Sequence, residues 1–204
     1  MCKPAIRRNA QIGDWVIGTD SKNTKLKDNK TYDFSDSIVY AMKITDKKLL
    51  SEYDEFCKND LTNKIPKWNT KDWRLRVGDC IYDYSANSEP IIRKGVHNEG
   101  NRQRDLGGYN SLLSGHFYYF GVEARPLPTE LKELIKKNQG HKKIEKPDLI
   151  QEFEKWIEQF EKNKLYADPQ MRWLFDRDLS DGELSSCIKE KLANDEDENE
   201  ERLC

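Results

Sequence analysis

The chain has 204 residues, of which 36% are hydrophobic and 35% are charged, and its net charge is −2. This composition predicts one domain, or one domain with an appendage, whose modest core relies on aromatic side chains. Five scattered cysteines without CxxC spacing and only three histidines argue against a zinc site. Since no signal peptide or apolar membrane span stands out, we expect a cytoplasmic protein without membrane association, metal or cofactor.

The first half of the chain reads mainly as strands. The apolar run GDWVIGT (13–19) and the alternating run SIVYAMKIT (37–45) predict strands, and in the second of these Ile38, Tyr40, Met42 and Ile44 would share one face. The polar residues 20–37 indicate a long loop. Residues 46–59 carry apolar side chains at helical spacing and predict an amphipathic helix.

The following segments continue this mixture. VGDCIYDY (77–84) and HFYYFGVEA (116–124) predict strands, and the Gly-, Asn- and Arg-rich residues 85–111 between them indicate a long hairpin with a mobile tip. Residues 128–139 predict a helix that starts at Pro128 and ends before Gly140. Residues 147–164 predict a second amphipathic helix.

This order of elements favours an α+β fold over an alternating parallel sheet. A Gly-Asp entry into an apolar strand, a loop, an alternating strand and a helix resembles the PUA-like group, which includes the ASCH, EVE and YTH domains. We therefore expect a PUA-like, partly open β-barrel with packed helices over residues 1–145 and a helical C-terminal portion over 146–193. The last segment, 194–204, holds six acidic residues and one arginine, so it predicts a disordered tail and leaves the rest of the chain positively charged.

Five blocks of sequence carry a sharper resemblance. CKPAIRRNAQIGDWVIGT (2–19), IVYAMKIT (38–45), GDCIYDY (78–84), FYYFG (117–121) and QGHK (139–142) together resemble the second type of nucleotide modification associated domain family. Its members are also described as proteins that hypermodify DNA bases, so the resemblance implies a role in DNA or nucleotide modification. Members carry an extra strand before the Cys2 block, and we expect this N-terminal segment to be missing here. Asp20 stands where the family tends to have glycine.

Cations and aromatic side chains are the candidates for ligand binding. A PUA-like barrel exposes its groove beside the first strand, so this resemblance implies one rim formed by Trp15, Thr19 and Lys22. Tyr82 or Tyr84 would offer a flat surface for a base. Ordinary surface charge and core packing remain the alternatives for these residues. The further candidates for phosphate binding are Arg7, Arg8, Arg102 and Arg104.

The chain has only three histidines, which limits the candidates for acid–base catalysis. His97 and His116 are candidates for acid–base work because histidine titrates near neutral pH, and Asp105 is the carboxylate that could accompany either of them. His97 and Asp105 lie in the basic, glycine-rich segment 93–108 and could close a second rim of the site. The alternative for His116 is a structural role at the start of an apolar strand.

These observations lead to one preferred function and two alternatives. The preferred function is binding of a nucleotide or a nucleic-acid base, modified or not, with DNA favoured over RNA as the partner. The first alternative is a transferase or hydrolase that modifies a base or nucleotide, with His97 or His116 and Asp105 as its acid–base groups. The second alternative is a phage–host defence component that sequesters a nucleotide signal or a protein partner.

Overall fold

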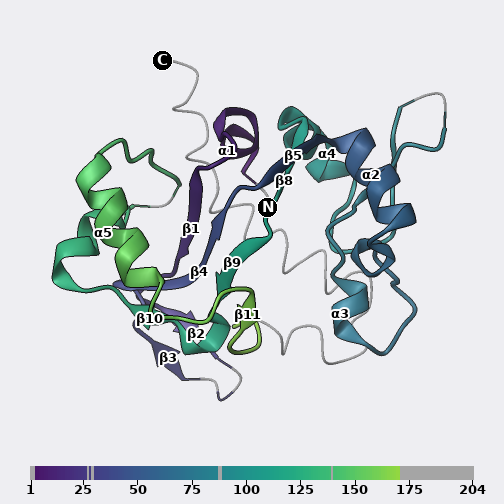
Figure 1. Ribbon diagram of the computed structural model, residues 1–204. Coiled ribbons are helices and arrows are strands. Elements are labelled where there is room, and N and C mark those ends of the chain that lie inside the picture. Colours follow the sequence, from purple (N-terminus) through teal and green to yellow (C-terminus); the bar gives the residue numbers. More distant parts are fainter. Residues whose placement is uncertain (1–2, 27, 29, 87–88, 139, 171–204) are drawn as a thin grey trace. The chain divides into compact units, whose positions relative to one another are not determined.

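A computed structural model describes residues 3–26, 28, 30–86, 89–138 and 140–170 (Figure 1). The chain divides into two compact units. Within the described ranges, unit 1 takes residues 3–12 and 46–113, and unit 2 takes residues 13–45 and 114–170. The predicted acidic tail 194–204 and residues 171–193 of the predicted helical portion lie outside the described residues, and the predicted domain boundaries stay a prediction.

Unit 2 is built on an open sheet with the strand order β1-β4-β9-β11, in which β10 also pairs with β4. All of these pairs are antiparallel except β11 with β9. Three of the four strands expected from the sequence, at 13–19, 37–45 and 116–124, are confirmed, whereas only Tyr82–Asp83 of the fourth, 77–84, is a strand. The predicted loop 20–37 contains a small antiparallel pair. The strands are β1 (Trp15–Thr19), β2 (Thr24–Lys25), β3 (Thr31–Tyr32), β4 (Ser37–Lys43), β9 (His116–Tyr119), β10 (Arg125–Pro126) and β11 (Lys164–Leu165).

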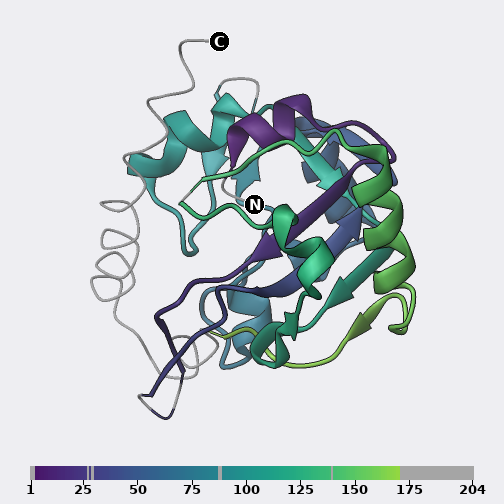
Figure 2. The ribbon, with the colours of Figure 1, turned by 90° about the vertical axis from the view of Figure 1, so that its left-hand side faces the viewer.

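One long helix covers this sheet. Figure 2 shows helix α5 (Pro147–Ile157) beside the strands of this sheet. The helix places Leu149, Phe153 and Ile157 on one side at a spacing of four residues, and all three side chains are buried. The predicted helix at 147–164 is thus confirmed, although it ends at Ile157. The rest of the core of unit 2 consists of Ile38, Ala41, Tyr118, Phe120, Leu127 and Leu131.

The burial pattern along β4 differs from the strict alternation that the sequence predicted. In a regular strand, residues three positions apart point to opposite faces. Ile38 and Ala41 are three positions apart, yet both are fully buried. The register between β1 and β4 shifts at Gly18 and Thr19, and such an irregularity exchanges the faces to which the following side chains point. Gly18 is required there, because a Cβ atom would lie 2.1 Å from Cε1 of Tyr40.

The helix predicted for residues 128–139 is shorter and tighter than expected. The structure has a 3₁₀ helix, η4 (Thr129–Leu134), with Leu131 buried in the core, and a further short turn, η3 (Gly121–Glu123), precedes it. The apolar residues of this segment span little more than one turn. Because the lysines that follow have no apolar face to bury, packing does not extend the helix toward Gly140.

Unit 1 contains short elements around helix α2 (Leu50–Asn59), which follows strand β5 (Asp46–Leu49) directly. Strand β5 pairs with β8 (Asn110–Leu113), and β6 (Tyr82–Asp83) pairs with β7 (Ile91–Ile92), both antiparallel. Tyr53 and Cys57 of α2 pack on Cys80 in a small core. The other helices are α1 (Pro4–Asn9), η1 (Thr62–Lys64), α3 (Trp73–Arg76), η2 (Glu99–Asn101) and α4 (Arg102–Gly107).

The predicted long hairpin over residues 85–111 is wrong. Strand β7 turns back to β6, whereas β8 pairs with β5, and helix α4 lies between them. The cause is a reciprocal cap: the Asn98 side chain accepts from the Gly100 amide at 2.9 Å, and the Asn101 side chain accepts from the Asn98 amide at 3.0 Å. These bonds satisfy the amides that a helical turn leaves unpaired at its start.

The fold is therefore a mixture of sheets and helices, as the sequence predicted. Among the residues described above, no sheet closes into a barrel, since the largest sheet ends at β1 and β11.

A glycine determines how α1 packs on the end of α4. A Cβ atom at Gly108 would lie 2.6 Å from the Cα of Pro4, whereas one at Gly107 would meet nothing nearer than 3.9 Å. We expect Gly108→Ala to lower the free energy of unfolding by about 1–3 kcal/mol, since α1 must move away. Gly107→Ala is the matched control and should be neutral or slightly stabilising. Urea unfolding of both variants measures the difference, and equal stabilities would contradict this packing.

Candidate functional site

A buried carboxylate organises the centre of unit 1. Asp54 lies on the inner face of α2 beside Tyr53, and its side chain is only 3% exposed. Burying a carboxylate is costly unless it is paired and hydrogen-bonded.

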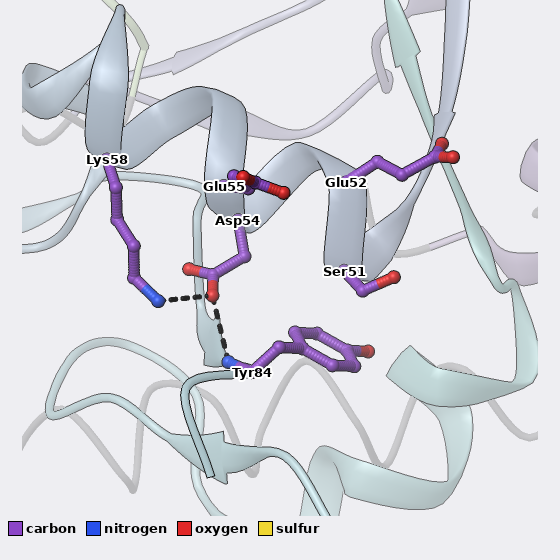
Figure 3. Close-up of a pocket in the computed structure, with 6 residues that line it drawn as sticks. All are labelled: Ser51, Glu52, Asp54, Glu55, Lys58 and Tyr84. Atoms are coloured by element: carbon purple, nitrogen blue, oxygen red, sulfur yellow. Dashed lines mark hydrogen bonds and ion pairs between the residues drawn. The ribbon is translucent and has the colours of Figure 1, made fainter. Parts of the chain in front are cut away.

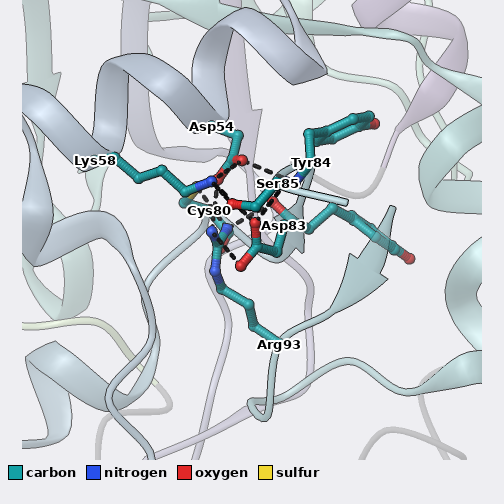
Figure 4. A network of polar contacts seen from close by, with 8 residues as sticks. Asp54, Lys58, Cys80, Asp83, Tyr84, Ser85 and Arg93 are labelled. Carbon is teal, nitrogen blue, oxygen red and sulfur yellow. Dashed lines mark hydrogen bonds and ion pairs between the residues drawn. The ribbon is translucent and has the colours of Figure 1, made fainter. Parts of the chain in front are cut away.

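Asp54 receives four hydrogen bonds from separate parts of unit 1 (Figure 4). Its Oδ2 accepts from Lys58 Nζ at 2.7 Å and from the Tyr84 amide at 2.8 Å. Its Oδ1 accepts from Arg93 Nη2 at 2.6 Å and from Cys80 Sγ at 3.6 Å. Burial by itself would raise the pKa of Asp54, but the hydrogen bonds from Lys58, Tyr84 and Arg93 together outweigh it and hold this pKa below its ordinary value.

Arg93 connects this carboxylate to β6. Its Nη1 donates to the carbonyl oxygens of Tyr82 at 2.6 Å and Cys80 at 3.1 Å, while Nη2 binds Asp54. The planar guanidinium thus fixes two strand carbonyls and one helix carboxylate at the same time. As a result, the backbone that carries Tyr82 and Tyr84 is anchored from both sides.

A second carboxylate, Asp83, completes this network at the surface. Its Oδ1 accepts from Lys58 Nζ at 2.9 Å and from the Ser85 amide at 2.9 Å, and Arg93 Nη2 lies 3.4 Å from Oδ2. The Ser85 hydroxyl, followed by Lys58, holds the pKa of Asp83 well below its ordinary value. Both carboxylates are therefore charged at neutral pH, opposite two cations.

The buried cysteines of this core are not nucleophiles. Burial raises the pKa of the Cys80 thiol well above its ordinary value, and it raises that of Cys57 as well. Since the thiolate is the reactive form of cysteine, these two side chains pack as neutral groups.

A pocket of about 300 Å³ lies next to this network, against the first turns of α2 (Figure 3). The Tyr84 side chain extends along this helix toward Ser51, as Figure 3 shows. The acidic groups at the pocket are Glu52, Asp54 and Glu55. The complete lining is Ser51, Glu52, Asp54, Glu55, Lys58 and Tyr84.

Tyr84 also lies within electrostatic reach of two arginines. Burial, followed by the charge of Asp54, raises the pKa of the Tyr84 phenol, whereas the charges of Arg7 and Arg102 act in the opposite direction. Tyr84 thus lines the pocket and is also influenced by the charges of Arg7 and Arg102.

Asp105 forms a second polar centre at α4. This buried carboxylate accepts at Oδ2 from the Tyr82 hydroxyl at 3.1 Å and lies 2.6 Å from Nδ1 of His97. The tautomer of His97 decides which of the two groups donates in this contact. The structure thus brings together the side chains of His97, Asp105 and Tyr82. In the sequence these three residues lie within 23 positions of one another.

The two arginines of α1 hold the same region from the other side. Arg7 is buried and donates through Nη2 to the carbonyl oxygen of Asp105, and Arg8 Nη1 donates to the Gly107 carbonyl at 2.6 Å. The side-chain amide of Asn110 donates to the Arg7 carbonyl at 3.3 Å. These bonds join α1 to α4, so both arginines contribute to the fold in addition to any role in binding.

Arg102 is a partly exposed cation above this centre. Its guanidinium lies 5.8 Å from the Tyr82 ring centroid, pairs with both carboxylate oxygens of Glu99 and donates to the Pro90 carbonyl at 2.7 Å. The predicted cation Arg104 lies on the same helix, half-buried.

The remaining predicted site residues belong to unit 2. Trp15 packs edge-on against Phe153 and His116, and its indole nitrogen donates to Glu154 at 2.9 Å. Packing in the core of unit 2 accounts for this side chain. Thr19, at the end of β1, and Lys22, in the turn that follows, are exposed.

His116 is the predicted catalytic candidate in unit 2. It lies at the start of β9, where its Nε2 is 3.2 Å from the Tyr118 hydroxyl. Burial, followed by the charges of Lys162 and Lys43, lowers its pKa below the ordinary histidine value. His116 is therefore neutral at physiological pH, and it belongs to a different unit from Asp105.

The comparison with known protein families gives one result. The family model described as nucleotide modification associated domain 2 matches residues 1–177. The chain belongs to this family. The description links the protein to nucleotide modification and agrees with the five sequence blocks. Neither the curated proteins nor the solved structures that were compared with the chain gave a match.

The described part of this family member contains no helix that is long and apolar enough to cross a membrane. No group of three or more histidine, cysteine, aspartate or glutamate side chains is arranged there as a metal site.

The sequence reasoning missed the network around Asp54 and Arg93 in this family member. A signal was present, because Asp54 stands four residues after Leu50 and three before Cys57, within the apolar stripe of α2. A buried carboxylate in such a stripe requires paired and hydrogen-bonded partners, and the largely buried Arg93 and the more exposed Lys58 supply them.

Proposed function

We propose that unit 1 binds a nucleotide or a nucleic-acid base and that this binding serves nucleotide modification. The family assignment supports the ligand class. The observation that carries the location is Tyr84, whose half-buried side chain lines the pocket next to α2 and whose phenol is influenced by the charges of Arg7 and Arg102. An aromatic face for a base beside cations for phosphate is the usual composition of sites for single nucleotides.

The charges of the pocket favour a particular orientation of the ligand. Glu52 and Glu55 repel phosphate, but their carboxylates can accept hydrogen bonds from the amino groups of a base. The phosphate groups would then lie on the side of Arg102. Its guanidinium is paired with both carboxylate oxygens of Glu99, so a phosphate would have to displace Glu99 there.

Tyr82 is not the stacking residue in this proposal. Its ring is buried, and its hydroxyl is bound to Asp105. Trp15, Thr19 and Lys22, which belong to unit 2, stay predictions, as does the PUA-like character of the open sheet in that unit. The family's description concerns nucleotide modification, and the preference for DNA over RNA as the partner stays a prediction from the sequence.

Tyr84→Ala tests the proposal. We expect this variant to bind deoxynucleotides or short single-stranded DNA about 5- to 150-fold more weakly than the wild type, which corresponds to the roughly 1–3 kcal/mol of one stacked base. Tyr84→Phe keeps the ring and should retain most of the affinity. Tyr109→Ala, which removes an exposed tyrosine of the same unit, is the matched control. Isothermal titration calorimetry measures the affinities, and equal losses for Tyr84→Ala and Tyr109→Ala would reject the pocket as the binding site.

A further inference from the structure

A positively charged segment lies between η4 and α5 in unit 2, and the binding proposal does not use it. Residues 132–146 contain six lysines and two glutamates, a formal charge of +4 in a chain whose net charge is −2. All six lysines are exposed. We call this stretch, which the structure describes except for residue 139, the basic segment. Its lysines are Lys132, Lys136, Lys137, Lys142, Lys143 and Lys146.

Apolar side chains hold the basic segment on the core of unit 2. Leu134, Ile135 and Ile144 are partly buried and pack against the buried cluster that contains Leu131 and Leu149. Since these side chains face the core, the lysines between them are left at the surface. The backbone on both sides of the lysines is thus fixed, so less of it has to be ordered when a ligand binds.

Lys136 and Lys137 are the cations of the basic segment that are most available to a ligand. Neither has a hydrogen bond or an ion pair among the described residues. Each of the four other lysines contacts an oxygen atom of unit 2. Lys143, for example, pairs with Glu145 at 2.6 Å, and the two side chains are 79% and 72% exposed. Because an ammonium group has three donors, such a lysine can also donate to a phosphate oxygen.

A nucleic-acid strand fits the basic segment better than a membrane does. A protein segment that lies on a lipid surface buries exposed apolar side chains in addition to its cations. Among the described residues from 131 to 146, no large apolar side chain is exposed. A nucleic-acid backbone requires only cations, and the family's description concerns nucleotide chemistry.

We propose that the basic segment binds the phosphate backbone of a nucleic-acid strand. Contacts of lysine with phosphate position a strand and carry no sequence information. The surface belongs to unit 2 and does not depend on the pocket of unit 1. What it implies for the substrate rests on the proposed nucleotide binding: the nucleotide that unit 1 binds is then part of a polynucleotide rather than a free nucleotide.

Lys136→Gln combined with Lys137→Gln tests the proposal in the full-length chain. The probes are a single-stranded DNA of mixed sequence, an RNA of the same sequence and the corresponding DNA duplex, measured by fluorescence anisotropy over a series of salt concentrations. We expect the double variant to bind about 10- to 100-fold more weakly than the wild type at low salt, because two phosphate contacts are lost. The slope of log affinity against log salt concentration should become shallower by roughly 1.4–1.8. Comparison of the three probes identifies the kind of strand.

The matched control is Lys155→Gln combined with Lys162→Gln. It removes two exposed lysines of the same unit that lie outside the basic segment. This variant should retain the wild-type affinity and salt slope. Equal losses in the two double variants, unchanged binding by the Lys136 and Lys137 variant, or a wild-type protein that binds none of the three probes overturns the proposal.

Deoxynucleoside monophosphates separate this proposal from the one for unit 1. Tyr84→Ala should weaken their binding, whereas the Lys136 and Lys137 variant should not. If the strands bind through these lysines and the monophosphates do not bind at all, the pocket is rejected and the basic segment is retained. Vesicles that contain phosphatidylserine are the last probe, and binding to them without binding to the nucleic acids overturns the proposal in favour of a membrane surface.

Discussion

Replacing Asp54 by alanine is expected to lower the free energy of unfolding by about 3–5 kcal/mol. The substitution removes the acceptor of hydrogen bonds from Lys58, Arg93 and the Tyr84 amide at once. Since the Arg93 side chain is only 12% exposed, its charge would remain in the interior with Asp83 as the nearest carboxylate, at 3.4 Å. Asp83, whose side chain is 35% exposed, compensates this buried charge only in part, so the loss of Asp54 costs more than the ion pair itself contributes.

Glu55→Ala is the matched control for this experiment. Glu55 is the next residue of the same helix, is exposed, and differs from Asp54 mainly in burial. Its removal should change the free energy of unfolding by less than about 0.5 kcal/mol. Urea unfolding monitored by circular dichroism gives both values, and a similar small effect at both positions would show that the network does not support unit 1.

A double variant separates two contributions to the free energy of unfolding: the penalty of a buried charge without its partner, and the net stabilisation by the ion pair. Asp54→Leu combined with Arg93→Met replaces both charged partners by apolar groups. We expect the double variant to be more stable than Asp54→Leu alone, because no isolated guanidinium is left inside. Lys58, whose side chain is 35% exposed, can turn to water in either case.

The same network gives unit 1 a defined pH dependence. The folded-state pKa of Asp54 lies below the unfolded value of about 3.9. The group therefore contributes its full stabilisation above the unfolded pKa, and this contribution declines as the pH falls from there toward the lower folded pKa. The folded-state pKa of Asp83 is lowered as well, so its contribution to stability also declines as the pH falls. Asp54→Asn should accordingly show a weaker acid dependence of stability than the wild type.

The elements predicted correctly from the sequence are those in which a hydrophobic repeat extends over enough residues to be recognised. The strands at Trp15 and His116 and the helix at Phe153 were found because several apolar residues repeat at one spacing. Strands of two residues, such as β6 and β7, carry no measurable period, and their pairing depends on Arg93 and on the contacts of their neighbours. For this reason the type of the long apolar elements was predicted correctly and the path of residues 85–111 incorrectly.

The candidate site was predictable only in part, for a related reason. Asp105 and His97 are eight residues apart, so their meeting required only a local turn, and the sequence indicated their shared segment. The approach of Arg7 to Asp105 joins residues 98 positions apart, and no feature of the sequence specifies it. It depends on Gly108, whose missing side chain lets α1 approach, and this role of a glycine is visible only in three dimensions.

Phe153→Ala is expected to produce the largest loss in unit 2, about 3–5 kcal/mol in the free energy of unfolding. The ring is 1% exposed and packs edge-on against Trp15 at 5.4 Å between centroids, so its removal leaves a cavity between α5 and the sheet. Trp15 is tied to Glu154 of the same helix through its indole nitrogen, which limits how far the strand can move to fill that cavity.

The measurement is hydrogen exchange resolved by segment, with Glu152→Ala, at an exposed neighbouring position of α5, as control. Exchange in β1, β4 and β9 should rise strongly in Phe153→Ala and stay unchanged in Glu152→Ala, because only the buried ring holds the helix on these strands. Phe153→Leu keeps most of the volume and should lose less than about 1.5 kcal/mol. If the alanine and leucine variants were equally stable, the contact between α5 and the sheet would not depend on the aromatic ring, and the core of unit 2 would have to be centred elsewhere.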